Sequence, residues 1–78
     1  MKLQDIRKKV GLSQSELSNQ SGVKLRTIQE YELGRRQIDN AHIDTLVGIA
    51  NVLRVPFYEL MEDALRINQI KENIKREV

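Results

Sequence analysis

The amino-acid sequence predicts an all-α protein made of five short helices and a C-terminal helical extension. Apolar residues recur at helical spacing, and glycines stand where the early helices should end. The clearest signal is the segment from Gln14 to Arg36, which reads as two short helices joined by a turn at Gly22. Two helices connected in this way form a helix-turn-helix. A chain of 78 residues suffices for one domain, so we expect the rest to be organised around this segment.

The first helix is expected from about Lys2 to Val10. Leu3, Ile6 and Val10 fall at i, i+3 and i+7, which places them on one apolar stripe. Gly11 is placed to end this helix.

The second helix should begin directly after Ser13. Ser13 and Glu16 have the spacing of a capping box, in which each side chain bonds to the backbone of the other. The helix is expected over about residues 14–20, with Leu17 in the core. Gly22 then tolerates the positive φ that a tight turn requires.

The third helix is expected from about Leu25 to Leu33, and Gly34 is placed to end it. With Ile28 turned towards the core, a rotation of ~100° per residue puts Tyr31 and Glu32 beside it. The opposite face consists of Arg26, Gln29, Glu30 and Leu33.

This outward face is rich in long polar side chains, and Arg35 and Arg36 follow it immediately. Such a helix suits insertion into a DNA major groove, with the arginines on phosphate groups. An ordinary amphipathic helix with a solvated charged face has the same periodicity. Periodicity alone therefore leaves both alternatives open.

The segment SQSELSNQSGVKLRTIQEYELGRR resembles the lambda-repressor/Cro-like (XRE) family of helix-turn-helix regulators. The matching features are the Ser-Gln-x-x-Leu opening, the Ser-Gly-Val turn, the Thr-Ile-x-x-Tyr-Glu-x-Gly-Arg-Arg close and a later Thr-Leu-x-x-Ile-Ala-x-x-Leu. The resemblance implies a lambda-repressor-like DNA-binding domain over residues 1–61. It also implies a sequence-specific transcriptional repressor that binds double-stranded DNA as a homodimer, with the third helix in the major groove.

Positions in the family imply which residues contact DNA. Base contacts are expected from Leu25, Arg26, Gln29 and Glu30. Phosphate contacts are expected from Gln14, Lys24, Thr27, Arg35 and Arg36. Arg26 can bind guanine through two hydrogen bonds, whereas Glu30 either accepts from cytosine N4 or merely pairs with Arg26 one turn away. Leu25 either meets a thymine methyl group or packs against the second helix.

Lys24 stands where this family commonly has a serine or threonine N-cap. Lysine is a poor cap, and its charge opposes the helix dipole. Two interpretations remain open: a functional positive charge near DNA phosphates, or a neutral surface substitution.

The resemblance further implies an ion pair between Arg7 and Glu32 that ties the first helix to the third. Glu32 lies near the edge of the core on the helical wheel, where an unpaired carboxylate would be costly.

A fourth helix is expected to begin with Asp39 as its N-cap and to run to about Leu53, with its core stripe at Leu46, Ile49, Ala50 and Leu53. Pro56 suits the first position of a fifth helix. Phe57, Leu60 and Met61 should then close the core.

Residues 62–78 extend beyond the family module, and we expect them to continue the fifth helix. Heptad-like spacing relates Leu60, Ala64, Ile67, Lys71, Ile74 and Val78. Three alternatives remain open: a dimerisation helix, a helix folded back on its own domain, or a frayed tail. An alternative function is an antitoxin or restriction-modification controller that acts through a protein partner bound by this segment.

Composition argues against several other classes. The chain has no cysteine, which excludes disulfides and thiolate sites. His42 is the only histidine, and Asp39 and Asp44 are spread around the helix rather than clustered with it. We therefore expect no enzyme, no metal site and no cofactor. The chain has no apolar run of membrane-spanning length and starts without a signal-like segment, so we expect a cytoplasmic protein with no membrane contact.

Charge is unevenly distributed along the chain. Residues 1–36 contain eight Lys or Arg and four Asp or Glu, a net charge of +4, whereas residues 37–78 contain five and seven, a net charge of −2. The basic half includes the helix-turn-helix, as a phosphate-facing surface requires.

Overall fold

The computed structural model describes residues 1–76, which form five α-helices, two short 3-10 helices and no strand. The α-helices are α1 (Lys2–Val10), α2 (Gln14–Ser21), α3 (Leu25–Glu32), α4 (Ile43–Leu53) and α5 (Ala64–Arg76), and the 3-10 helices are η1 (Ile38–Asn40) and η2 (Phe57–Leu60). The all-α prediction is thus confirmed. Val78, predicted as the last heptad position, lies outside the described residues.

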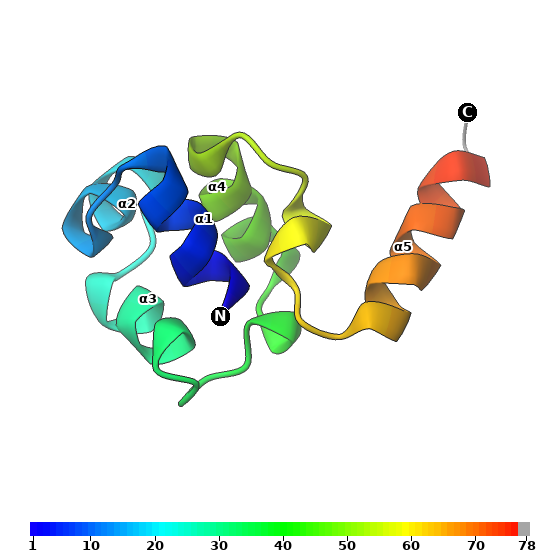
Figure 1. Cartoon of the computed structure of the whole chain (residues 1–78), viewed down its shortest axis with the longest axis horizontal. Coiled ribbons are helices and arrows are strands. Elements are labelled where there is room, and N and C mark those ends of the chain that lie inside the picture. Colours follow the sequence, from blue (N-terminus) through cyan, green and yellow to red (C-terminus); the bar gives the residue numbers. More distant parts are fainter. Residues whose placement is uncertain (77–78) are drawn as a thin grey trace.

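Helices α1 to α4 and the two 3-10 helices surround one core, while α5 projects from this body at the end opposite to α2 and α3 (Figure 1). The most deeply buried large side chains are Leu3, Leu17, Ile28, Ile38, Ile49, Leu60 and Met61. They come from every element except α5, so the first 61 residues supply nearly all of the core. Among residues 1–76, none of the helices combines the length and apolar character needed to cross a bilayer.

The local signals for α2 and its turn are present as predicted. The Ser13 hydroxyl accepts from the Glu16 N–H at 3.0 Å, and the Glu16 carboxylate accepts from the Ser13 N–H at 2.9 Å. Gly22 has φ +75°, a left-handed conformation that ends α2. The half-buried Ser18 hydroxyl donates to the carbonyl of Val23 at 2.6 Å, which holds the turn against α2.

Val10 does not belong to the core, contrary to the predicted stripe. Its side chain is 49% exposed. Val10 is the last residue of α1, and the chain turns at Gly11, so that Leu12 packs against the core instead. The predicted apolar stripe was right for Leu3 and Ile6, which both contact the core, but it extended one turn too far.

Asp39 is not the N-cap of α4. It lies in η1, and α4 begins at Ile43 with His42 at its N-cap position. The Asp39 carboxylate instead accepts from the backbone N–H groups of Glu62 and Asp63, each at 2.8 Å. A local pattern could not reveal these partners because they lie more than twenty residues away in the chain.

The predicted fifth helix is interrupted, so residues 62–76 do not continue it. After η2 the buried Met61 adopts an extended backbone, with ψ 153°, which a helix does not allow. Helix α5 then begins anew at Ala64, where the Asp63 carboxylate accepts from the N–H groups of Leu65 and Arg66 at 3.0 and 3.3 Å.

The first half of α5 contacts the body of the domain, and its second half is more exposed. Ile67 is buried, and the Lys71 ammonium lies 5.4 Å from the centre of the Tyr58 ring in η2. Ala64 is exposed although it is a heptad position, and Ile74 is 43% exposed. The break at residues 61–63 separates Leu60 from the heptad positions that lie within α5, and whether these form a seam with a second copy stays a prediction.

Candidate nucleic-acid interface

Helix α3 lies at the edge of the molecule and turns one face outward. Ile28 and Tyr31 are buried beneath it, whereas Arg26 is exposed and Leu33 is 67% exposed. Leu25 is 36% exposed, so part of its side chain lies at the surface. Helix α5 lies at the far end of the molecule and leaves this face uncovered (Figure 1).

A buried ion pair fixes α3 to α1. The Arg7 guanidinium donates to both oxygens of Glu32, with Nε 2.8 Å from Oε2 and Nη2 2.9 Å from Oε1. Its third donor, Nη1, bonds to the carbonyl of Leu12 at 2.8 Å. The Glu32 side chain is only 2% exposed. The structure therefore contains the Arg7–Glu32 pair that the sequence analysis predicts.

The electrostatics of this pair favour both charged forms. Burial raises the pKa of Glu32, but hydrogen bonds from Arg7 and Gln14 and the charge of Arg7 outweigh it, so this pKa lies below its ordinary value. The hydrogen bond to Glu32 raises the pKa of Arg7 despite its burial. Both groups are thus ionised at neutral pH, and the pair holds α3 at a fixed angle to α1.

Gln14 joins this network from the first residue of α2. Its Nε2 donates to Glu32 Oε1 at 3.0 Å. The amide retains a second N–H and its oxygen, since neither makes a side-chain hydrogen bond within the described residues. The half-buried Gln14 amide lies at the N-terminus of α2, and its hydrogen bond to Glu32 fixes its orientation there.

Glu30 pairs with Arg36 and not with Arg26, the partner that the sequence alternative named. The Arg36 Nη2 lies 3.1 Å from Glu30 Oε1, and the two side chains are 55% and 26% exposed. The backbone N–H groups of Arg35 and Arg36 also bond to the Glu30 carbonyl, at 2.9 and 3.3 Å. The turn at Gly34, with φ +75°, thus brings Arg36 back over the outward face of α3.

Arg26 and Arg35 have no ion-pair partner within residues 1–76. Both side chains are exposed. Two guanidinium groups on or next to α3 are therefore available to an anionic or hydrogen-bonding ligand.

A hollow of about 640 Å³ separates α3 from the segment that leads into α4. Three of the predicted phosphate residues, Lys24, Thr27 and Arg36, line it on the α3 side. On the other side are Asn40, His42 and Thr45, which sequence reasoning did not assign to DNA. No local motif marks these three residues, because only the path of the loop after α3 brings them opposite Lys24.

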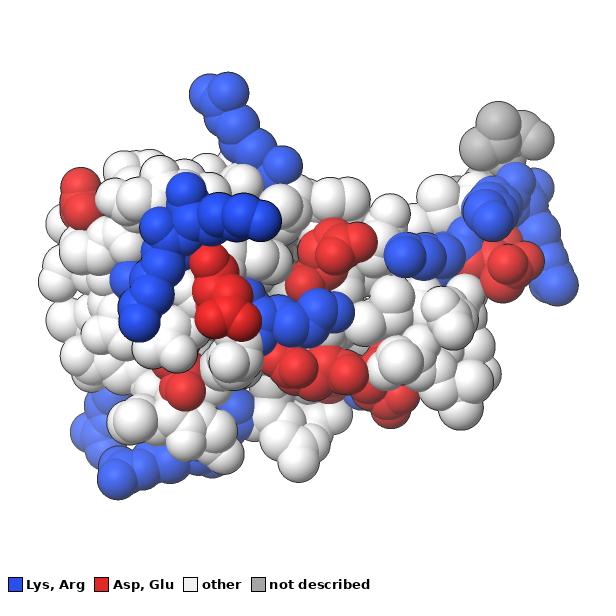
Figure 2. Space-filling view, viewed as in Figure 1, with Lys and Arg blue, Asp and Glu red and all other residues white. Residues whose placement is uncertain are grey.

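Charge is arranged in three zones along the molecule. Residues 1–36 carry +4; residues 37–63 contain one basic and five acidic residues, giving −4; and residues 64–76 contain four basic and one acidic residue, giving +3. Figure 2 shows acidic side chains gathered in the middle of the face, with basic side chains at the helix-turn-helix end and again over α5. The net charge of −2 over residues 37–78 combines this acidic middle with the basic α5, so it did not reveal the positive charge of α5.

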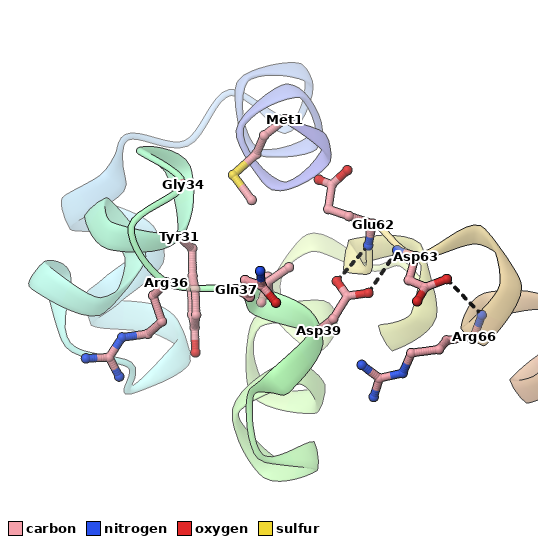
Figure 3. Close-up of a pocket in the computed structure, with 10 residues that line it drawn as sticks. Met1, Tyr31, Gly34, Arg36, Gln37, Asp39, Glu62, Asp63 and Arg66 are labelled. Carbon is pink, nitrogen blue, oxygen red and sulfur yellow. Dashed lines mark hydrogen bonds between the residues drawn. The ribbon is translucent and has the colours of Figure 1, made fainter.

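A second hollow, of about 410 Å³, lies where the loop after α3 meets the start of α5 (Figure 3). Asp39 and its two bonds to Glu62 and Asp63 stand on one side of it, and Tyr31 stands on the other. Burial raises the pKa of Tyr31, and the nearby charge of Arg36 partly opposes this. The two hydrogen bonds that the Asp39 carboxylate accepts from Glu62 and Asp63 join this loop to the residues that precede α5.

Comparison with known proteins assigns most of the chain to one group. A family model described as Helix-turn-helix matches residues 3–60, that is, α1 to η2 with the loop between α3 and α4. A search of curated proteins and a search of solved structures each found no significant match.

Proposed function

The chain belongs to the lambda-repressor/Cro-like family of helix-turn-helix DNA-binding regulators, and we propose that it is a sequence-specific repressor. Its recognition element is α3, which enters the major groove of double-stranded DNA. The observation that carries this proposal is the uncovered face of α3, held in place by the buried contacts of Arg7 and Gln14 with Glu32. Bound in this way, the protein blocks access of other proteins to the same DNA.

Base recognition is assigned to four side chains on or beside this face: Leu25, Arg26, Gln29 and Glu30. Arg26 is the principal reader because its guanidinium is exposed and unpaired within residues 1–76. Two parallel hydrogen bonds from an arginine to guanine O6 and N7 are the commonest specific contact in the major groove. Leu25, 36% exposed, is placed to meet a thymine methyl group.

Phosphate contacts are assigned to the residues that border α3: Gln14, Lys24, Thr27, Arg35 and Arg36. Lys24 occupies the N-cap position of α3 without any capping hydrogen bond. A serine or threonine there would stabilise the helix more. This lack of a capping function supports a role for Lys24 in binding a DNA phosphate, as part of the basic zone of residues 1–36.

We further propose that the protein binds as a homodimer through residues 62–78. Ile74 of α5 is 43% exposed, and the half-buried Ile70 lies one turn before it on the same face of the helix. Contact of this face with a second copy would remove both side chains from water. Two copies would then present their α3 helices to half-sites about one helical turn apart, ~34 Å.

A partner-binding module of the antitoxin or restriction-modification controller type is the second candidate. The same apolar face of α5, together with the net charge of +3 over residues 64–76, would suit an acidic partner protein. A stoichiometric second protein that co-purifies with the full chain but not with residues 1–63 would favour this alternative.

The DNA-binding proposal is tested with a site selected from a random duplex library. We expect Arg26→Ala to lose about 5- to 150-fold of the preference for the selected site over one altered base pair. Arg35→Ala should weaken selected and scrambled duplexes alike and lower the salt dependence by about one phosphate contact. Lys75→Ala, which removes a positive charge from α5, is the matched control and should change neither quantity. Unchanged binding in both Arg26→Ala and Arg35→Ala would contradict the assignment.

A further inference from the structure

We propose that Glu30 and Arg36 form a switch, in which Arg36 leaves Glu30 for a DNA phosphate only when a base amino group donates to Glu30 in its place. The switch makes one phosphate contact conditional on one base. This inference rests on the proposed function, because it requires α3 to lie in the major groove.

The geometry allows the Arg36 side chain to move while its backbone stays fixed. The Glu30 carbonyl accepts from the N–H groups of Arg35 and Arg36 at 2.9 and 3.3 Å, which anchors the turn to α3. The guanidinium is held only by a single contact of 3.1 Å to the Glu30 carboxylate, and the Arg36 side chain is 55% exposed. Exposed ion pairs of this kind are weak, so another partner of opposite charge can replace Glu30.

The Glu30 carboxylate cannot remain unpaired against DNA. Docking removes water from the outward face of α3 and brings the carboxylate close to a polyanion, and both effects penalise a bare negative charge. Arg36 is the one ion-pair partner of Glu30 within the described residues. A second donor must therefore be present before Arg36 can leave.

Only some bases can supply that donor. In the major groove, cytosine presents its N4 amino group and adenine its N6 amino group, whereas guanine presents only acceptors and thymine an acceptor and a methyl group. Opposite cytosine or adenine, Glu30 gains a hydrogen bond and releases Arg36. Opposite guanine or thymine, Arg36 stays on Glu30 and the phosphate contact is not made.

When released from Glu30, the Arg36 side chain can turn into the neighbouring hollow. It lines the hollow of about 640 Å³ that also contains Lys24 and Thr27. Lys24 has no ion-pair partner within residues 1–76, so this hollow holds a positive charge that is not neutralised internally. A phosphate between Lys24 and the turn at Arg36 would be reached by rotation of the Arg36 side chain alone.

The switch predicts an effect on salt dependence that a simple base contact would not have. For the wild-type protein, the slope of log affinity against log salt should be steeper by about 0.9 on the selected site than on the same site with guanine or thymine facing Glu30. The base pair in question is found by substituting each position of the selected site in turn. It is the position whose preference disappears in Glu30→Gln.

Three variants and one control separate the two partners of the switch. In Glu30→Gln, Arg36 is free on every sequence, so affinity for the altered site should rise about 3- to 10-fold and the two salt slopes should become equal. Glu30→Ala should behave likewise, which excludes a new contact made by the glutamine. Arg36→Ala removes the conditional phosphate contact, so it should lower the salt slope on the selected site by about 0.9 and leave little difference in slope between the two sites. It should also weaken the altered site, because Glu30 then faces DNA without a partner. Arg35→Ala, the matched control one residue earlier, should weaken both sites equally.

The outcomes distinguish this proposal from the function on which it rests. If Arg36→Ala lowers the salt slope on both sites equally, or if Glu30→Gln keeps the wild-type difference in slope, the phosphate contact is unconditional and the switch is overturned, while recognition by α3 stands. If no position loses its preference in Glu30→Gln, the switch is likewise overturned. If the wild-type protein selects no sequence, both the switch and the proposed function fail. Thermal unfolding of each variant establishes that these surface substitutions leave the fold intact.

Discussion

The Glu32 carboxylate is the polar group on which the placement of α3 depends most. One oxygen accepts from Arg7 Nε, and the other accepts from both Arg7 Nη2 and Gln14. Three hydrogen bonds from two elements thus converge on a side chain that is 2% exposed. A helix of eight residues such as α3 is too short to be stable alone, so these contacts and its apolar face hold it in position.

Replacing Glu32 with glutamine should therefore be strongly destabilising. Glu32→Gln leaves the Arg7 guanidinium, 7% exposed as a residue, without a countercharge. We expect the free energy of unfolding to fall by about 3 kcal/mol, the usual result of breaking a buried pair by removing one partner. Urea unfolding at pH 7 measures the loss. Glu16→Gln is the matched control, because a glutamine still completes the capping box and should cost little.

The same pair has a defined pH signature. The pKa of Glu32 lies below its ordinary value of 4.5, so its contribution to stability is complete above about pH 4.5 and is lost as the pH falls through the folded-state pKa. The stability difference between the wild type and Glu32→Gln should thus be constant from pH 6 to 5 and shrink in more acidic solution. A difference that stays constant down to pH 2 would contradict an ionised Glu32 in the folded state.

At the scale of the helices, the sequence predicted those features that neighbouring residues determine. The capping box at Ser13 and the left-handed turns at Gly22 and Gly34 are each fixed within a few residues, and all three were predicted correctly. Asp39 was assigned wrongly because its bonding partners come from the start of α5. The break before α5 was missed because the burial of Met61, a tertiary effect, overrides the local helical pattern.

The N-cap residue of α3, Lys24, does not stabilise the helix as a serine or threonine would. Lys24 makes no capping hydrogen bond, and its charge opposes the dipole at this end of the helix. Lys24→Ser should raise the free energy of unfolding by about 1 kcal/mol and, at the same time, weaken binding to every duplex by removing one phosphate contact. Urea unfolding and a salt titration of DNA binding measure the two effects. A more stable variant with unchanged DNA affinity would show that Lys24 is a neutral surface substitution.

At the scale of the molecule, a basic helix-turn-helix end, an acidic middle and a basic α5 follow one another along its length (Figure 2). The positions of the candidate DNA residues within α2, α3 and the following turn could be predicted because family motifs fix them. The place of Asn40, His42 and Thr45 at the same hollow could not be predicted, since only the path of a loop brings them there. The Glu30–Arg36 pair was also missed, because it depends on how the turn at Gly34 folds back.

The role of α5 is a prediction about the assembly. Sedimentation of the wild-type protein should show twice the mass of one chain, and deletion of residues 64–78 should give a monomer that retains the Asp39 contacts to Glu62 and Asp63. Ile74→Lys should shift the equilibrium towards monomer without removing the helix, because a charge replaces an apolar contact. Asn68→Lys, at another exposed position of α5, is the matched control. A wild-type monomer at high concentration would contradict the dimer.

The most direct test of the account is to titrate isotope-labelled protein with its selected duplex and follow every backbone amide by nuclear magnetic resonance. If α3 is the recognition helix, the largest shift changes fall on residues 24–36, with smaller changes at Gln14 and few in α5 beyond Ile67. Shift changes concentrated in α5, with residues 24–36 unaffected, would contradict the assignment of α3 to the major groove.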